Sequence, residues 1–387
     1  MKKTNGFGLF GVIVIIIITA LVSSIATGVI MLNNSSINTL GETIDLTKDE
    51  DLQEFIQVYE TILSKYYDEI DKKAMLEAAE EGMLDFLGDK YTTYLEDSEY
   101  EEIINELSGT YNGIGVAIKG NSIVNVTPSS PAEKAGILAN DTLIKVNDID
   151  VQNMNSEEIV ALIKNNETKI VNLEISRNGD SLHFSITKED LENVTVSYQK
   201  LENTNIGYIS LQNFSENLDS QVSKALTDLE SQGINSLIID VRDNVGGYLS
   251  AAEDTASLFL SEGKNIYSLQ TSENKFTYSD KTKEKRTYPI VVLMNGNSAS
   301  ASEILAAALK ESYGATLVGT KSYGKGKVQQ VLSLNSGDSV KVSTAKWLTP
   351  NGDCIDGIGI MPDYNVVFTG VNQVDEQLNK AIELLQN

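Results

Sequence analysis

The stretch that decides the fold is SLIIDVRDNVGGYL, residues 236–249. It begins with an almost uninterrupted apolar run from Ser236 to Val241, as expected for a parallel strand that is covered on both faces. Paired glycines, Gly246 and Gly247, follow this run, and a helical pattern then extends from Tyr248 to Leu260. A buried strand that leads through glycines into a helix is typical of an α/β sheet.

The same alternation continues along the chain on both sides of this stretch. The pattern predicts two more strands and two more helices, at residues 206–211, 289–294, 221–229 and 301–310. We therefore expect an α/β core over residues 190–365, followed by a C-terminal segment over residues 366–387.

Residues 109–189 have a different texture, with short strands, turns and two short helices, and we expect a small α+β domain there. Its first strand is entered through Gly113, Ile114, Gly115 and Val116. Successive N–H groups in such a loop can receive a peptide carboxylate, and the adjacent sheet edge can take the peptide as an extra strand. The two glycines alone would indicate only a turn, but the rest of the module follows in order, which favours a site for a peptide tail.

Two regions precede this domain. Residues 49–108 are predicted to be helical, because Phe55, Val58, Ile62 and Tyr66 recur at helical spacing. Residues 33–48 are polar and without periodicity, and we interpret them as a linker.

The N-terminus carries an uncharged apolar stretch over residues 7–32, long enough to span a membrane. Lys2 and Lys3 precede it, which favours a cytoplasmic N-terminus. We expect a single-pass anchor in the cell membrane, with the remainder of the chain extracytoplasmic. The alternative is a cleaved signal peptide, since Ser24-Ile25-Ala26 is a plausible cleavage site.

The composition narrows the possible functions. The 387 residues include 55 acidic and 30 basic side chains, and a net charge of −25 argues against nucleic acid as a partner, because phosphate binding needs a basic surface. One cysteine, Cys354, and one histidine, His183, exclude an intrachain disulfide and a multi-Cys or multi-His metal site. We expect no metal and no other cofactor. His183 lies in a strand-like stretch, so a hydrolase must find its general base elsewhere.

Residues 297–304 provide the candidate nucleophile. They join a buried strand to an alanine-rich helix, and Ser300 and Glu303 have the spacing of a capping box. On its own this pattern would indicate only a helix cap. The same geometry suits a nucleophile, because a serine at this corner lies beside unpaired N–H groups that can hold an oxyanion.

The candidate general base is Lys325. Burial can lower the pKa of a lysine from about 10.4 toward 7, and the flanking Gly324 and Gly326 allow close approach to another backbone. Gln329 lies four residues on and can orient a neutral lysine. Lys327 is the competing base, but it lacks a glycine on its far side.

A rival interpretation takes Ser322 and Lys325 as an S-x-x-K pair, as in penicillin-binding enzymes. That motif needs a helix, which glycines at 324 and 326 disfavour, and its K-T-G and S-D-N partners are missing. Residues 261–264 match the same four-letter pattern, so the pattern has little specificity.

Three blocks of the sequence resemble the carboxyl-terminal processing peptidases, Ser/Lys serine proteases that include the tail-specific proteases. The blocks are residues 240–247, 298–304 and 324–329. The small domain resembles a PDZ domain through residues 113–116, 130–136 and 141–147. The resemblance covers nearly everything after the linker. It implies a multi-domain α/β protein: an α/β protease core with an inserted α+β PDZ domain, an N-terminal helical region and a transmembrane helix.

The resemblance also implies roles for individual residues. In that family a serine is the nucleophile, a lysine between glycines is the base and a glutamine is its partner, which correspond to Ser300, Lys325 and Gln329.

The oxyanion would be held by backbone N–H groups of Ala301 and of Gly246 or Gly247. Val245 replaces a frequent proline of the family, which leaves open which glycine donates. Glu311 stands near the position of an aspartate that some members carry.

The implied function is a membrane-anchored serine endopeptidase that recognises apolar C-terminal tails of proteins through its PDZ domain and cleaves them. The family also suggests a homodimer, formed by the terminal helical segments. The alternative is a peptide-binding PDZ scaffold with an inactive core, which the intact Ser300, Lys325 and Gln329 speak against.

Overall fold

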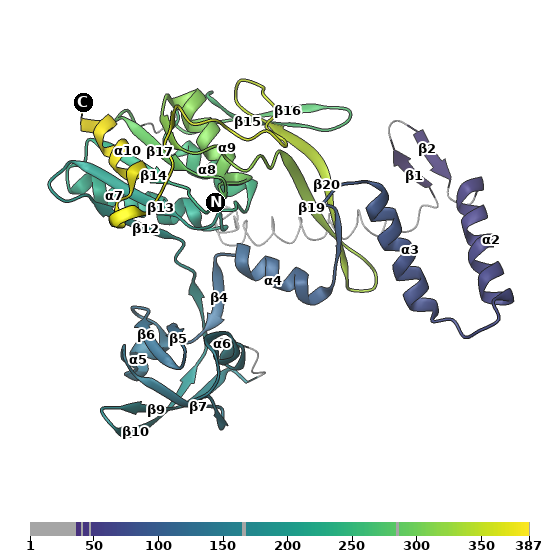
Figure 1. Ribbon diagram of the computed structural model, residues 1–387, viewed down its shortest axis with the longest axis horizontal. Helices are drawn as coiled ribbons and strands as arrows, with labels where there is room; N and C mark the ends of the chain where they lie inside the picture. The colour runs from purple at the N-terminus through teal and green to yellow at the C-terminus, as the bar shows by residue number, and fades with distance from the viewer. Residues whose placement is uncertain (1–35, 40–41, 46–47, 165–167, 284–285, 387) are drawn as a thin grey trace, which may run out of the picture. The chain divides into compact units, whose positions relative to one another are not determined.

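The computed structural model describes residues 36–39, 42–45, 48–164, 168–283 and 286–386, and the chain divides into two units, residues 1–89 and 90–387 (Figure 1). In the described residues of the first unit, strands β1 (Ser36–Thr39) and β2 (Glu42–Asp45) form an antiparallel hairpin. This hairpin occupies part of the predicted linker. The expected transmembrane segment, residues 7–32, lies outside the described residues, and no helix within them is long and apolar enough to cross a membrane.

Helices α2 (Glu50–Lys65) and α3 (Lys72–Phe86) complete this unit, as predicted. Asp49 and Asp71 cap them by accepting hydrogen bonds from backbone N–H groups of the first turn. Neither helix buries a side chain within the described residues.

The prediction that residues 49–108 form a helical region is wrong at one place. Residues Thr93–Leu95, already in the second unit, form strand β3, which pairs with β20 of the same unit, and helix α4 (Asp97–Leu107) follows it. The Tyr and Thr residues at 91–94 favour an extended backbone. Pairing with β20 then supplies hydrogen-bond partners for the backbone groups of the extended segment.

The small domain is an α+β module with a six-stranded sheet in the order β10-β9-β7-β6-β5, with β8 paired to β7. Helix α5 begins with the Ser130 cap and Pro131 and ends at Gly136, which adopts φ 91° as left-handed helix caps require. A two-stranded ribbon of β4 and β11 leads into and out of the module. The elements are β4 (Thr110–Gly113), β5 (Val116–Lys119), β6 (Ser122–Val126), α5 (Pro131–Ala135), β7 (Thr142–Val146), β8 (Ile149–Asp150), α6 (Ser156–Lys164), β9 (Ile170–Arg177), β10 (Asp180–Thr187) and β11 (Glu189–Glu192).

The core is built on a six-stranded sheet in the order β12-β13-β14-β17-β18-β21, in which only β12 runs antiparallel to its neighbour. Strand β14 (Ser236–Asp240) is buried at every position, as predicted for a strand covered on both faces. Leu237 and Ile239 face helices α7, α8 and α9, whereas Ile238 packs with Ala381 of α10 on the other side (Figure 1). The remaining elements are β12 (Val196–Lys200), β13 (Ile206–Leu211), α7 (Leu218–Ser231), α8 (Leu249–Ser257), β17 (Ile290–Met294), α9 (Ala301–Ala308), the π-helical η1 (Leu309–Tyr313), β18 (Thr316–Gly319), β21 (Tyr364–Asn365), the 3₁₀ turn η2 (Val371–Gln373) and α10 (Glu376–Gln386).

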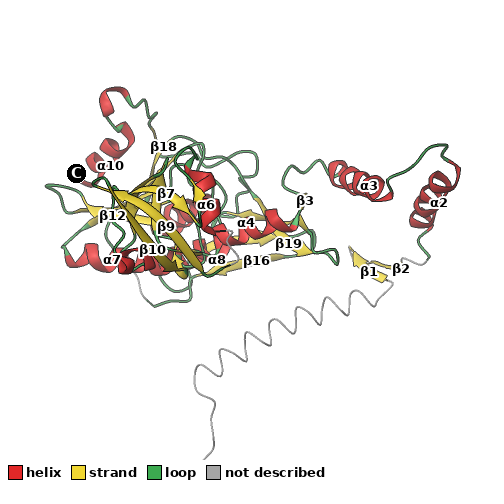
Figure 2. Cartoon of the chain, turned by 90° about the horizontal axis from the view of Figure 1, so that it is seen from below, coloured by secondary structure: helices red, strands yellow, loops and turns green. Residues whose placement is uncertain are grey.

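A second sheet, in the order β16-β15-β20-β19 with β3 also on β20, completes this unit (Figure 1). Figure 2 labels its strands β3, β16 and β19. Near its end the long strand β20 carries Trp347, which is 1% exposed and joins the main core. The strands are β15 (Asn265–Gln270), β16 (Lys275–Ser279), β19 (Lys327–Ser333) and β20 (Ser339–Leu348). Edge strand β19 begins at Lys327, two residues after Lys325, which brings this sheet to the candidate site.

Candidate active site

Ser300 lies at the corner between β17 and α9, as the N-cap residue of the helix. Its backbone has φ 55° and ψ −115°, a conformation that costs energy for any residue but glycine and that is concentrated at functional sites. Ser298 donates its hydroxyl hydrogen to the carbonyl of Val241 at 2.7 Å, and Ser302 donates to that of Asn244 at 2.8 Å. These two hydroxyls therefore hold the corner together, whereas Ser300 lines an adjacent cavity.

The glycine pair backs directly onto this corner. Gly246 and Gly247 adopt φ 106° and 149°, and a Cβ on Gly246 would lie 2.9 Å from the Cβ of Ser300 and 3.0 Å from the nitrogen of Ala301. No side chain fits there. The N–H of Gly246 donates to Oδ1 of Asn244 at 2.9 Å, so this amide is already used within its own loop.

Side chains connect two loops: the glycine loop, which follows β14 and carries Gly246 and Gly247, and the serine loop, which precedes α9 and carries Ser300. The Asp243 carboxylate accepts hydrogen bonds from the side-chain amides of Asn295 and Asn297, at 2.9 and 2.8 Å. These bonds lower the pKa of Asp243, with Asn297 contributing most. The N–H of Ala299 also donates to the carbonyl of Asn244 at 3.0 Å. The two loops therefore form one rigid frame around Ser300.

Lys325 approaches from a third loop, between β18 and β19. Gly324 adopts φ 88°, and a Cβ on it would lie 2.8 Å from the nitrogen of Gly359, while one on Gly326 would lie 2.6 Å from the Cβ of Asp356. Both glycines are thus required by close backbone packing. The indole N–H of Trp347 donates to the Lys325 carbonyl at 2.9 Å.

The side chain of Lys325 is half-buried. Burial lowers the pKa of Lys325 below its usual value, and the positive charge of Lys341 lowers it further. Tyr323 and Glu303 act in the opposite direction and raise the pKa of Lys325. The net shift favours the neutral amine, which is the form that can accept a proton.

Gln329 lies in β19, next to a register shift between Val328 and Gln329. Its amide nitrogen donates to the hydroxyl of Ser343 at 3.2 Å. The structure therefore places the Gln329 side chain in the same cavity as Lys325 but gives its amide a partner on β20.

One cavity of about 760 Å³ brings most of these groups together. Ser300, Lys325, Gln329, Gly246 and Gly247 all line it, and Lys327 and Lys341 contribute two further positive charges. Its apolar wall comes from α4, the glycine loop, α9 and the second sheet: Ile103, Ile104, Leu107, Val245, Ile304, Val328 and Trp347. The arrangement brings together a candidate nucleophile, a candidate base and an apolar surface.

Known proteins match the chain along nearly its whole length. Residues 205–366 match peptidase family S41, residues 122–177 match the PDZ domain, and residues 21–99 match the N-terminal domain of the activating protease CtpB. The carboxy-terminal processing protease CtpA of Bacillus subtilis (strain 168) is 37% identical over 354 residues, which cover 90% of this chain and 75% of that protein. CtpB of the same organism is 35% identical, with coverage of 82% and 68%.

The chain belongs to peptidase family S41. Among solved structures, a photosystem II D1 C-terminal processing protease has a TM-score of 0.53 at 27% identity and covers 87% of this chain and 92% of that chain. The S41 chain is a carboxy-terminal processing serine protease with a PDZ domain, which confirms the resemblance found in the sequence.

The four predicted peptide-binding residues of this S41 protease lie at the junction of β4 and β5, just before the stretch that matches the PDZ domain. Gly113 ends β4, and Val116 begins β5, the edge strand of the PDZ sheet. Gly115 has φ 86°, and a Cβ on it would lie 2.3 Å from the Cβ of Ser130. The carbonyl of buried Ile114 accepts from the N–H of Ala132 at 2.9 Å, so α5 fixes the loop.

Three other candidates lie in positions that do not suit the chemical role considered for each in the sequence. His183 is exposed on β10. Glu311, in η1, accepts a hydrogen bond from the N–H of Asn351 at 2.8 Å. Residues 321–326 are not helical, and the hydroxyl of Ser322 is buried, so the S-x-x-K interpretation fails.

Sequence reasoning missed the contribution of α4 to the cavity. Tyr100, Ile103, Ile104 and Leu107 line it and recur at three- and four-residue spacing. This amphipathic stripe was visible in the sequence, but only the fold shows that it faces this cavity rather than a helix.

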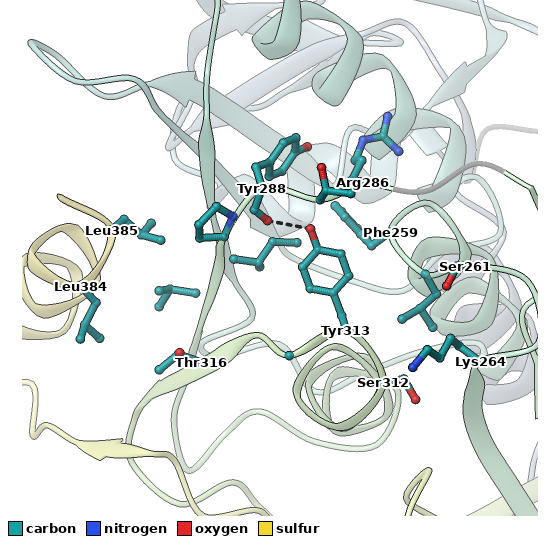
Figure 3. A pocket seen from close by; sticks show the side chains of 16 residues that line it. Phe259, Ser261, Lys264, Arg286, Tyr288, Ser312, Tyr313, Thr316, Leu384 and Leu385 are labelled. Atoms are coloured by element: carbon teal, nitrogen blue, oxygen red, sulfur yellow. Dashed lines mark hydrogen bonds between the residues drawn. The ribbon is translucent and has the colours of Figure 1, made fainter. Parts of the chain in front are cut away.

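A second cavity of about 610 Å³ lies at the other end of β17, where the strand begins (Figure 3). The hydroxyl of Tyr313 donates to the Tyr288 carbonyl at 2.6 Å, and the Arg286 guanidinium is paired with Glu230 at 2.7 Å. None of the predicted site residues lines this cavity. Ligands of open α/β sheets bind at the carboxyl ends of the strands, where Ser300 lies, so this second cavity is not the candidate active site.

Proposed function

We propose that Ser300 and Lys325 form the catalytic dyad of this serine protease. The observation that carries the proposal is that a strained serine at a helix N-terminus and a half-buried lysine with a lowered pKa line one cavity. The Ser300 Oγ attacks the scissile carbonyl carbon, and the neutral Lys325 Nζ takes the hydroxyl proton. The protonated lysine then gives this proton to the leaving amine, and a water molecule hydrolyses the resulting ester by the same route.

The oxyanion is held by the backbone N–H groups of Ala301 and Gly247. Ala301 is the first residue of α9, and N–H groups of the first turn have no acceptor within the helix. Of the two glycines, Gly247 is favoured because the Gly246 N–H is used by Asn244. Gln329 lines the cavity and orients the amine of Lys325 once a rearrangement releases it from Ser343.

Single substitutions test the dyad. Ser300→Ala and Lys325→Ala should each reduce peptide cleavage by about 10³-fold or more, and Ser300→Ala should also abolish labelling by a fluorophosphonate. Ser261→Ala and Lys264→Ala, in the S-x-x-K look-alike beside the second cavity, are the matched controls. Cleavage at the wild-type rate by folded Ser300→Ala would refute the nucleophile, and activity lost in Lys327→Ala but kept in Lys325→Ala would move the base.

The PDZ domain holds the substrate by its apolar C-terminal tail. The support is the edge strand β5 with the Gly113–Val116 loop at its start, which suits addition of a peptide strand with its carboxylate at the loop. The uncharged residues 7–32 anchor the protein in the cell membrane with its catalytic part extracytoplasmic. Resistance to carbonate extraction tests the anchor, and release of a soluble protein beginning near residue 27 would contradict it.

The protein forms a homodimer through its terminal helical segments. The support is that α2 leaves Phe55 and Val58 48% and 53% exposed, although they lie on its apolar stripe. Sedimentation of the full chain in detergent tests the dimer, and a monomer at micromolar concentration would contradict it.

A further inference from the structure

Glu303 is a buried carboxyl group in the first turn of α9, next to the candidate nucleophile. It is 1% exposed, and no lysine or arginine among the described residues lies within ion-pair distance of it. Burying a carboxylate is costly unless it is hydrogen-bonded. The protein therefore needs compensating donors around Glu303.

These donors come from both catalytic loops. Oε2 accepts from the N–H of Ser300 and from the N–H of Lys325, each at 2.9 Å. Oε1 accepts from the hydroxyl of Ser322 at 2.5 Å and from the N–H of Gly324 at 2.8 Å. Four hydrogen bonds fill the acceptor sites of a carboxylate.

A capping box accounts for only one of these four bonds, the one from the Ser300 N–H. The other three reach across 19 to 22 positions to the lysine loop. One oxygen atom, Oε2, thus binds the backbone of both members of the proposed dyad.

We infer that Glu303 is a positioning residue that locks the backbones of Ser300 and Lys325 to each other through its carboxylate. The inference rests on the proposed dyad and adds a residue that touches neither the substrate nor the reacting atoms. Hydrogen bonds to a charged group are shorter and stronger than neutral ones, which suits a part that must hold two loops in one geometry.

The charge of Glu303 has a second effect on the same site. It raises the pKa of Lys325, against burial and the positive charges of Lys341 and Lys90, which lower it. The charged and titratable groups around Lys325 are Lys90, Tyr91, Glu303, Tyr323, Lys327 and Lys341. Holding the loops together thus brings a negative charge close to a base that must be neutral.

Glu303→Gln separates these two effects from a merely structural role. The amide nitrogen cannot accept hydrogen bonds, so one pair of donors loses its partner, and kcat should fall about 100-fold. Removing the negative charge also lowers the pKa of Lys325 further, so the acid limb of the pH–rate profile should move to lower pH. Loss of stability alone would reduce the rate without moving this limb.

The experiment measures kcat and KM for one peptide from about pH 5 to about pH 10. Glu303→Asp keeps the charge with a shorter reach, and should lower kcat with the limb near its wild-type position. Glu311→Gln is the matched control and should match wild type in both. Glu311 lies in η1, directly after α9, and accepts a hydrogen bond from the N–H of Asn351.

The outcomes distinguish this inference from the dyad. An active Ser300→Ala enzyme would overturn the dyad whatever Glu303 does. If Ser300→Ala is inactive, two results for Glu303→Gln refute the role of Glu303. One is a wild-type kcat with the acid limb at its wild-type pH, and the other is a reduced kcat with the acid limb unmoved. Should Glu303→Gln not fold, Ser322→Ala removes a single donor, and a wild-type kcat in that variant would equally refute it.

Discussion

At the scale of single residues, the proposed chemistry depends on the charge of Lys325. A base must be neutral to accept a proton, so activity should rise with pH through the lowered pKa of Lys325. Lys341→Met removes a nearby positive charge, which makes protonation of Lys325 easier. The pKa of Lys325 then rises and the acid limb should move to higher pH, the opposite of Glu303→Gln. The measurement is the pH–rate profile of each variant. Lys346→Met, which replaces an exposed lysine on the same strand, is the control. Acid limbs that coincide in Lys341→Met and wild type would contradict the prediction.

At the scale of elements, α4 provides one wall of the cavity that holds the proposed dyad, through its apolar stripe. Ile103→Asp places a charge in this wall, while the half-buried position should let the helix fold. For substrates with apolar residues at the cleavage site, kcat/KM should fall by about 10- to 100-fold, the value of one buried apolar side chain. Asn105→Asp, on the exposed side of the helix, is the control. Equal kcat/KM values for both variants would show that α4 does not contact the substrate.

At the scale of the whole molecule, the PDZ domain and the protease core should act on one substrate. A disordered protein that ends in an apolar residue with a free carboxylate should be cleaved several-fold faster than the same protein with an amidated C-terminus. The N–H groups of the Gly113–Val116 loop bind an anion, and an amidated terminus carries no negative charge. The test varies the substrate and not the loop. Gly115 has φ 86° and lies against Ser130, so replacing it with proline or with any other residue would distort the loop itself. Identical rates for both ends would mean that the domain does not select termini.

The sequence was sufficient where a pattern is local. The apolar run of β14, the capping of α9 at Ser300 and the glycines around Lys325 each follow from a few consecutive residues, and the structure places all three in one region. It was insufficient where a role depends on distant partners. Nothing near Glu303 in the chain reveals that Ser322, 19 residues on, donates to it, and the Ser343 partner of Gln329 lies on another strand. Strand β3 was mistaken for helix because its partner, β20, lies far along the chain.

Trp347 is the chain's one tryptophan, and its indole N–H is hydrogen-bonded to the carbonyl of Lys325. Intrinsic fluorescence of this protein excited at the red edge of the absorption band therefore originates from a single site, directly behind the proposed base. Any movement of the lysine loop, on substrate binding or on release of Gln329, changes the solvation of that indole and so its emission maximum. The protein thus carries a built-in optical probe of its own active site, which can be read in stopped-flow mixing without attaching a dye.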